Sequence, residues 1–170
     1  MSSPAGKAAE DRAAEDRAVP FDSPEQEAYL NLWRTYDRLK ALEESLFADY
    51  GLTAQQYNAL RLLRAQRPDS LPTLAIGARL ISRAPDITRL VNKLAERGLV
   101  ERKRDLANRR IVNVTITRAG LDLLDTIAAP LAECHQRQLG HLTAEQLRRL
   151  IELLKLARQP HEADRSRVGR

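Results

Sequence analysis

The feature that most constrains the fold of this chain is a change of hydrophobic period at Gly98. Over residues 85–97, apolar side chains recur at spacings of three and four, which is typical of one face of an α-helix. Beyond the glycine, residues 99–104 and 110–116 are predicted to be strands, since apolar and polar residues alternate in the second of them. The sequence therefore predicts a helix followed directly by a β-hairpin.

A shorter helix is expected immediately before this one, over residues 74–80, with a tight turn at 81–84. Pro85 favours this arrangement because it keeps Ala84 out of the helical region and suits the first turn of a new helix. The two predicted strands are joined by a turn-forming linker at 105–109. A short helix, a turn, a longer helix and a hairpin together make a winged helix-turn-helix.

A long helix is predicted over about residues 23–50. Ser23 can accept a hydrogen bond from the amide of Gln26, whose side chain can reach back to Ser23, and Gly51 can end the helix in a left-handed conformation. Its apolar residues form one stripe, which consists of Leu32, Tyr36, Leu39, Leu42 and Leu46.

Three further helices have clear boundaries in the sequence. A second capping box at Thr53 begins a helix that stops before Pro68. Thr117 is expected to cap the helix after the hairpin, in which Pro130 predicts a kink or break. Thr143 begins the last helix.

These elements predict a mainly α protein with a small β-hairpin wing, in the α+β class. Residues 23–157 are expected to form one folded domain, with the winged helix-turn-helix at about 53–117. Residues 1–22, which repeat Ala-Ala-Glu-Asp-Arg and have little to bury, are expected to be a disordered tail, and 158–170 a second tail.

Composition excludes several classes of protein. Only one cysteine, Cys134, is present, so no intrachain disulfide can form. No apolar run approaches the roughly 20 residues of a membrane span, and the N-terminal segment does not resemble a secretory signal, so a cytoplasmic location is expected. There is no glycine-rich phosphate loop, nucleophile elbow or HExxH motif, so neither an enzyme nor a cofactor is predicted. Cys134 and the histidines His135, His141 and His161 lack a metal-binding spacing.

Positive charge is concentrated in the predicted helix-turn-helix and hairpin. The chain has a formal net charge of +5. Residues 79–110 alone contain ten basic and four acidic residues, so the rest of the chain is slightly acidic. Such a focused charge favours a polyanion such as DNA. The alternatives are an ordinary solvated face or a winged-helix module that binds protein, but the cationic face argues against the second.

The predicted DNA-contacting residues share the polar face of the helix at 85–97, its preceding turn and the hairpin. Arg89 can bond guanine with two donors, and Thr88 can touch a thymine methyl group. Asp86 can accept from cytosine or stabilise the helix dipole, and we favour the dipole. Either Arg109 or Arg110 can enter the minor groove, unless the hairpin touches only phosphates. The full set is Arg83, Pro85, Asp86, Thr88, Arg89, Asn92, Lys93, Arg102, Arg104, Asn108, Arg109 and Arg110.

Residues 23–157 resemble the MarR family of bacterial transcriptional regulators. The resemblance is carried by four segments in order, GLTAQQY at 51–57, ITRLVNKL at 87–94, ERGLV at 96–100 and VTITRAG at 114–120. The family's wing usually reads Asp-x-Arg, with the acid orienting a minor-groove arginine. Asn108 stands here in place of that acid.

The resemblance implies a homodimer formed by helices at about 23–50 and 117–157, bound to double-stranded DNA with a near-palindromic operator. Leu139, Leu142, Leu150 and Leu154 would supply part of the interface, or would only close the core of the monomer. The resemblance also implies a repressor released by a small anionic aromatic ligand. Its candidate pocket residues are Trp33, Tyr36, Tyr57 and Arg61, although simple packing is the favoured interpretation of the rings.

Overall fold

The computed structural model describes residues 21–81 and 86–162 of the chain. The chain divides into two compact units, residues 1–40 and 41–170. Helix α2 (Pro24–Asp49) begins in the first unit and ends in the second. The predicted turn at 81–84 and most of both predicted tails lie outside the described residues.

The first unit contains the start of α2. Ser23 Oγ accepts from the Gln26 amide at 3.2 Å, as predicted. The side chain of Gln26 does not return to Ser23, however, because Asp22 offers it both a donor and an acceptor: Gln26 Oε1 accepts from the Asp22 amide at 2.7 Å and Nε2 donates to Asp22 Oδ2 at 2.9 Å. Several large apolar side chains of this part of α2 are half or more exposed, namely Tyr29, Leu32, Trp33 and Tyr36.

In the second unit, α2 ends as predicted at Gly51, whose φ is +63°. The amide of Leu52 donates to Phe47 O at 2.9 Å, which is the longer bond of a Schellman cap. Thr53 then begins α3 (Ala54–Gln66) with both hydrogen bonds of a capping box, in which the side chains and amides of Thr53 and Gln56 bond reciprocally. Two consecutive local signals therefore set the corner between α2 and α3.

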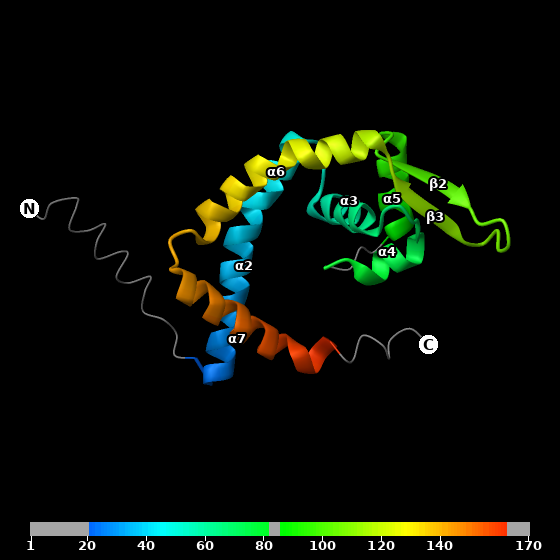
Figure 1. Ribbon diagram of the computed structural model, residues 1–170. Coiled ribbons are helices and arrows are strands. Elements are labelled where there is room, and N and C mark those ends of the chain that lie inside the picture. The colour runs from blue at the N-terminus through cyan, green and yellow to red at the C-terminus, as the bar shows by residue number, and fades with distance from the viewer. Residues whose placement is uncertain (1–20, 82–85, 163–170) are drawn as a thin grey trace, which may run out of the picture. The chain divides into compact units, whose positions relative to one another are not determined.

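The sheet has three strands, one more than the sequence predicted. β2 (Val100–Arg104) and β3 (Val112–Ile116) form the predicted hairpin, with Val100 opposite Ile116. The third strand is β1 (Leu71–Pro72), which pairs antiparallel with β3, so that the order is β1-β3-β2. A strand of two residues that includes a proline has no periodicity to detect, which is why it was missed. In Figure 1 the β2–β3 hairpin projects away from helices α3, α4 (Thr73–Arg79) and α5 (Ile87–Glu96).

Helix α5 ends in the predicted cap. Gly98 has a φ of +68°, the amide of Leu99 donates to Leu94 O at 3.0 Å, and the amide of Gly98 donates to Ala95 O at 2.9 Å. This is a Schellman cap with the apolar pair that the sequence predicted. It turns the chain from the helix straight into β2.

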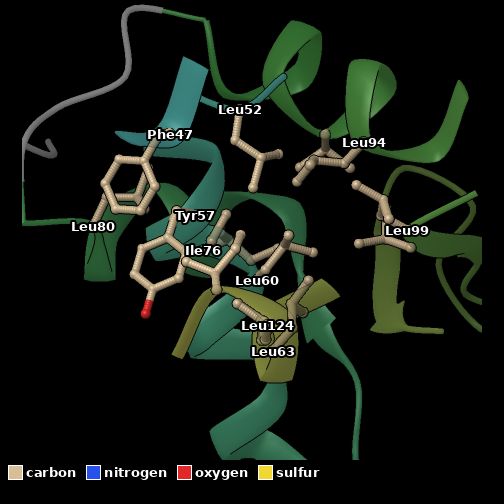
Figure 2. Packing of buried hydrophobic residues seen from close by; sticks show 14 of the residues in the cluster. Phe47, Leu52, Tyr57, Leu60, Leu63, Ile76, Leu80, Leu94, Leu99 and Leu124 are labelled. Atoms are coloured by element: carbon tan, nitrogen blue, oxygen red, sulfur yellow. The ribbon is translucent and has the colours of Figure 1, made fainter. Parts of the chain in front are cut away.

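The core of the second unit joins all these elements. Leu60 and Leu63 from α3 and Leu124 from α6 (Arg118–Leu139) point toward one another in Figure 2. The ring of Phe47 stacks on Tyr57, with centroids 4.5 Å apart. The side chains with the largest buried volume are Phe47, Leu60, Leu63, Ile76, Leu94, Leu124 and Ile127.

Helix α6 begins at Thr117, whose hydroxyl accepts from the Gly120 amide at 3.1 Å. A Cβ at Gly120 would lie 2.3 Å from Leu99 O, so only glycine permits this approach of helix and strand. A kink or a break was predicted at Pro130, and the break is wrong, since α6 continues as a helix through the proline. The buried side chains of Ile127 and Leu131 anchor the helix on both sides of the proline.

Helix α7 (Ala144–Glu162) begins with a capping box at Thr143 and has no buried residue. The predicted start of the tail at 158 is wrong, because the helix continues through Pro160 to Glu162. Arg158 Nε lies 2.6 Å from Glu162 Oε1, an i,i+4 pair that stabilises the last turn. No helix in the described ranges has the length and apolarity that crossing a membrane requires.

Candidate nucleic-acid interface

Helix α5 presents a polar face opposite the core. Val91 and Leu94 are buried, whereas Thr88, Arg89 and Lys93 are exposed. The remaining predicted residues of this region, Arg83 and Pro85, lie outside the described residues. The exposed face of α5 therefore offers a hydroxyl and two cations to a ligand.

Asp86 caps the N-terminus of α5. Its Oδ1 accepts from the Arg89 amide at 2.8 Å. A carboxylate in this position satisfies a free amide and interacts favourably with the positive end of the helix dipole. The geometry agrees with the capping interpretation of Asp86 that we favoured over base contact.

Asn92 is less available than the sequence indicated. The residue is only partly exposed, and its Oδ1 is buried without a hydrogen-bond partner among the described residues. The side chain of Asn92 is therefore turned partly toward the protein.

Two shallow hollows flank the N-terminal half of α5. One, of about 370 Å³, lies between α3 and α5 and is lined by Gln55, Asp86, Arg89 and Lys93 among others. The other, of about 350 Å³, is lined by Thr88 from α5, Leu74 from α4, and Arg102 and Arg110 from the hairpin, among others. The second hollow brings three of the predicted DNA-contacting side chains from two elements to one place.

The strand period separates the cations of β2. Alternate residues of a strand point to opposite faces, so Arg102 and Arg104 share one face and Lys103 takes the other. Arg102 and Arg110 line one hollow, whereas Glu101, Lys103 and Arg104 line a different one.

The wing turn is ordered by two short polar side chains. Asp105 Oδ1 accepts from the amides of Ala107 and Asn108, each at 2.9 Å. Asn108 Oδ1 accepts from the Arg110 amide at 3.1 Å. The backbone bonds from Asn108 and Ala107 hold the pKa of the Asp105 carboxyl below its usual value, because they favour the charged form. Sequence reasoning missed Asp105, although an aspartate at the start of a polar turn is the expected signal for such bonds.

Arg97 ties α5 to the corner between α2 and α3. Its guanidinium donates to Tyr50 O at 2.9 Å and to Gly51 O, the two carbonyls that directly follow α2. A cation at a helix C-terminus is stabilising because it satisfies free carbonyls and complements the dipole. Sequence reasoning missed this role, since nothing local links residues 46 positions apart.

The four residues of the predicted ligand pocket are divided between the two units. Trp33 and Tyr36 belong to the first unit, where both are exposed. In the second unit Tyr57 is buried against Phe47, which makes it a core residue, and the Arg61 guanidinium lies 6.0 Å from the centroid of its ring. Arg61 also lines a hollow of about 200 Å³ together with Arg79, which sequence reasoning did not single out.

Cys134 is a free thiol and is fully buried, as expected of a small core residue. Within residues 21–81 and 86–162, no group of three His, Cys, Asp or Glu side chains is placed to hold a metal ion.

A basic helix beside a basic hairpin defines a winged helix-turn-helix protein, and comparison with known proteins identifies its family. Residues 52–112 match the model of the MarR family. The transcriptional repressor NicR of Pseudomonas putida is 32% identical over 137 residues, which are 81% of this chain and 85% of NicR. The chain belongs to the MarR family, whose members are transcriptional regulators and not enzymes.

Two solved structures have the same fold. A MarR transcription factor from Planctomyces limnophilus is 56% identical, with a TM-score of 0.65, over 81% of this chain and 99% of that one. BpsR of Bordetella bronchiseptica is 24% identical, with a TM-score of 0.69, over 77% of this chain and 98% of that one. Both match a mostly helical chain with a small antiparallel sheet.

Proposed function

We propose that this protein is a homodimeric, sequence-specific repressor that binds a near-palindromic operator in the cytoplasm. The observation that carries the proposal is the hollow where Thr88 of α5 meets Arg102 and Arg110 of the hairpin. A recognition helix in the major groove and a wing at the adjacent backbone need their cations on one side of the protein. Arg89 extends the same helix face as a candidate reader of guanine.

The proposal of a dimer rests on apolar side chains that are exposed in each unit. Helix α7 exposes half or more of Ile151, Leu153 and Leu156, and the first unit exposes Trp33 and Tyr36. Exposed large apolar side chains, where they gather, mark interaction surfaces in soluble proteins. A second copy of the chain would bury them and would present two recognition helices about 34–36 Å apart, one turn of DNA.

The most specific part of the proposal is that a small anionic aromatic ligand releases the repressor from DNA. DNA binding by BpsR is regulated by 6-hydroxynicotinic acid, and NicR is a repressor. In this chain the hollow lined by Arg61 and Arg79 also has apolar walls, at Leu62, Leu80 and Ile81. Two guanidinium groups beside apolar walls suit a carboxylate on a ring.

The test is fluorescence anisotropy on two DNA duplexes at two salt concentrations. One duplex is selected from a randomised library by the protein itself, and the other is the same sequence shuffled. We expect tight, salt-sensitive binding that favours the selected duplex, and sedimentation should show two chains bound. Equal binding to both duplexes would contradict sequence-specific recognition, and no binding at low salt would favour a protein-binding module instead.

A further inference from the structure

Asp105 is the one acidic residue of the wing turn, and both of its oxygens are occupied. Oδ1 accepts from the amides of Ala107 and Asn108, each at 2.9 Å, and Oδ2 accepts from Asn113 Nδ2 at 3.2 Å. Asn113 lies on β3, opposite Lys103 of β2. The carboxylate therefore ties the start of the turn both to its own backbone and to the returning strand.

The rest of the turn closes around these bonds. The Asp105 amide donates to Ile111 O at 3.0 Å, and the Ile111 amide donates to Asn108 O at 2.9 Å. Asn108 Oδ1 accepts from the Arg110 amide at 3.1 Å. The backbone that carries Arg109 and Arg110 is thus fixed by hydrogen bonds that all lead back to Asp105 and Asn108.

We infer that Asp105 is a positioning residue for DNA recognition, which holds Arg109 and Arg110 of the wing in place without touching DNA itself. The inference rests on the proposed function. It concerns a role in which the side chain acts only through the turn, since its oxygens already bond to Ala107, Asn108 and Asn113. The amide bonds also lower the pKa of this carboxyl, because they favour its charged form.

Electrostatics alone predicts the opposite effect for this residue. Asp105 stands among Arg102, Lys103 and Arg104 on one side and Arg109 and Arg110 on the other. A negative charge there opposes attraction to phosphates, so its removal should strengthen binding to any DNA. A positioning role predicts that removal weakens binding to the selected sequence, because a loosened turn must be ordered again on binding. The two effects differ in sign on the selected duplex, which makes the inference easy to test.

Three variants separate the effect of the negative charge of Asp105 from the effect of the hydrogen bonds that order the turn. Asp105→Ala removes both. Asp105→Asn keeps an oxygen that can accept from the two turn amides, while the Asn113 amide can present its own oxygen to the new NH₂ group. Glu101→Ala is the matched control, because Glu101 is an exposed acid on β2, opposite Thr115 and outside the turn, and its removal changes the net charge equally.

The experiment measures the affinity of each variant for the selected and the shuffled duplex. We expect Asp105→Ala to lose about three- to tenfold in affinity for the selected duplex, the cost of ordering one or two side chains again. Its affinity for the shuffled duplex should stay equal or rise. Asp105→Asn should stay within about twofold of the native protein, and Glu101→Ala should bind both duplexes equally well or more tightly.

Amide hydrogen exchange of the free protein provides a readout that needs no DNA. The amides of Ala107 and Asn108 should lose protection in Asp105→Ala and keep it in Glu101→Ala. If Asp105→Ala instead strengthens binding to both duplexes, as Glu101→Ala does, or if the two amides keep their protection, the inference is overturned while the proposed function stands. If the native protein does not distinguish the two duplexes, the proposed function fails and the inference fails with it.

Discussion

The winged helix-turn-helix and the last helix differ sharply in what they bury, although they are built from similar local signals. Helix α3 has 13 residues and buries Tyr57, Ala59, Leu60 and Leu63 together with Gln56. Helix α7 has 19 residues and buries none. Both begin with a capping box, at Thr53 and at Thr143, so their helical signals are equally clear.

The difference shows that the two regions complete their cores in different ways. The helix-turn-helix and sheet surround one apolar centre, in which Leu60, Ile76, Leu94 and Val114 are fully buried. Helix α7 leaves apolar side chains such as Ile151 and Leu156 half or more exposed. A helix of this kind is usually stabilised by packing its apolar face, so the contrast points to a partner surface for α7.

The largest expected effect is on the free energy of unfolding, when a side chain is removed from the core of the helix-turn-helix. Leu60→Ala should lower the free energy of unfolding by about 2–5 kcal/mol, because it removes a fully buried side chain and leaves a cavity. Urea denaturation at fixed protein concentration would measure it. Leu106→Ala is the control, since this leucine at the wing tip is fully exposed and its loss should change stability by less than about 0.5 kcal/mol.

The second prediction tests the face of α7. Ile151 is 50% exposed, and its burial in two symmetric copies would contribute roughly 1.5–3 kcal/mol to association. Ile151→Asp should therefore raise the dissociation constant of the dimer at least tenfold, which sedimentation equilibrium would measure. Glu152→Gln on the same helix should leave it unchanged. If the native protein stays monomeric at high concentration, α7 does not pack against a second copy, and this prediction is contradicted.

The third prediction concerns recognition, which we assign to the winged helix-turn-helix alone. Arg89→Ala should weaken binding to the selected duplex by about 1–3 kcal/mol and relax base preference at one position in each half-site. Arg104→Ala should weaken binding evenly across sequences and lower the salt slope by about one unit. Neither substitution should change the dimer. Equal losses on selected and shuffled DNA would contradict the base-reading role of Arg89.

The smallest effect is expected at Asp86. Serine caps a helix about as well as aspartate, so Asp86→Ser should leave both stability and base preference nearly unchanged if the residue acts only as a cap. Asp86→Ala should cost about 1 kcal/mol of stability. Thermal unfolding and a repeated selection from the randomised library would measure the two properties. A changed base preference in Asp86→Ser would show that the carboxylate reads DNA.

Much of the fold could be predicted because its signals are local. The caps at Thr53, Gly51 and Gly98 depend on residues within one turn of the helix, and all three are present as predicted. Two of the predictions that failed involve prolines, since α6 continues through Pro130 and α7 continues through Pro160. Beside Pro130, the burial of Ile127 and Leu131 depends on tertiary packing, which local signals do not reveal.

The candidate site was predicted only in part, because local signals do not show which elements meet. Helical periodicity places Thr88, Arg89 and Lys93 on one exposed face. It cannot show that Arg110 of the hairpin comes to Thr88, that Asn92 turns partly inward, or that Asp105 orders the wing turn. These facts depend on the strand register and on the closing of a loop.

The sequence by itself determined the order of the elements, their caps and the concentration of positive charge, since hydrophobic period, capping and composition act over a few residues. Only the tertiary structure decided which elements bury their apolar faces and which cations share a surface. The bonds from Arg97 to the carbonyls of Tyr50 and Gly51 illustrate the distinction. Each end of that contact is a recognisable helix terminus, but their meeting depends on the packing of α3 and α5 in one core.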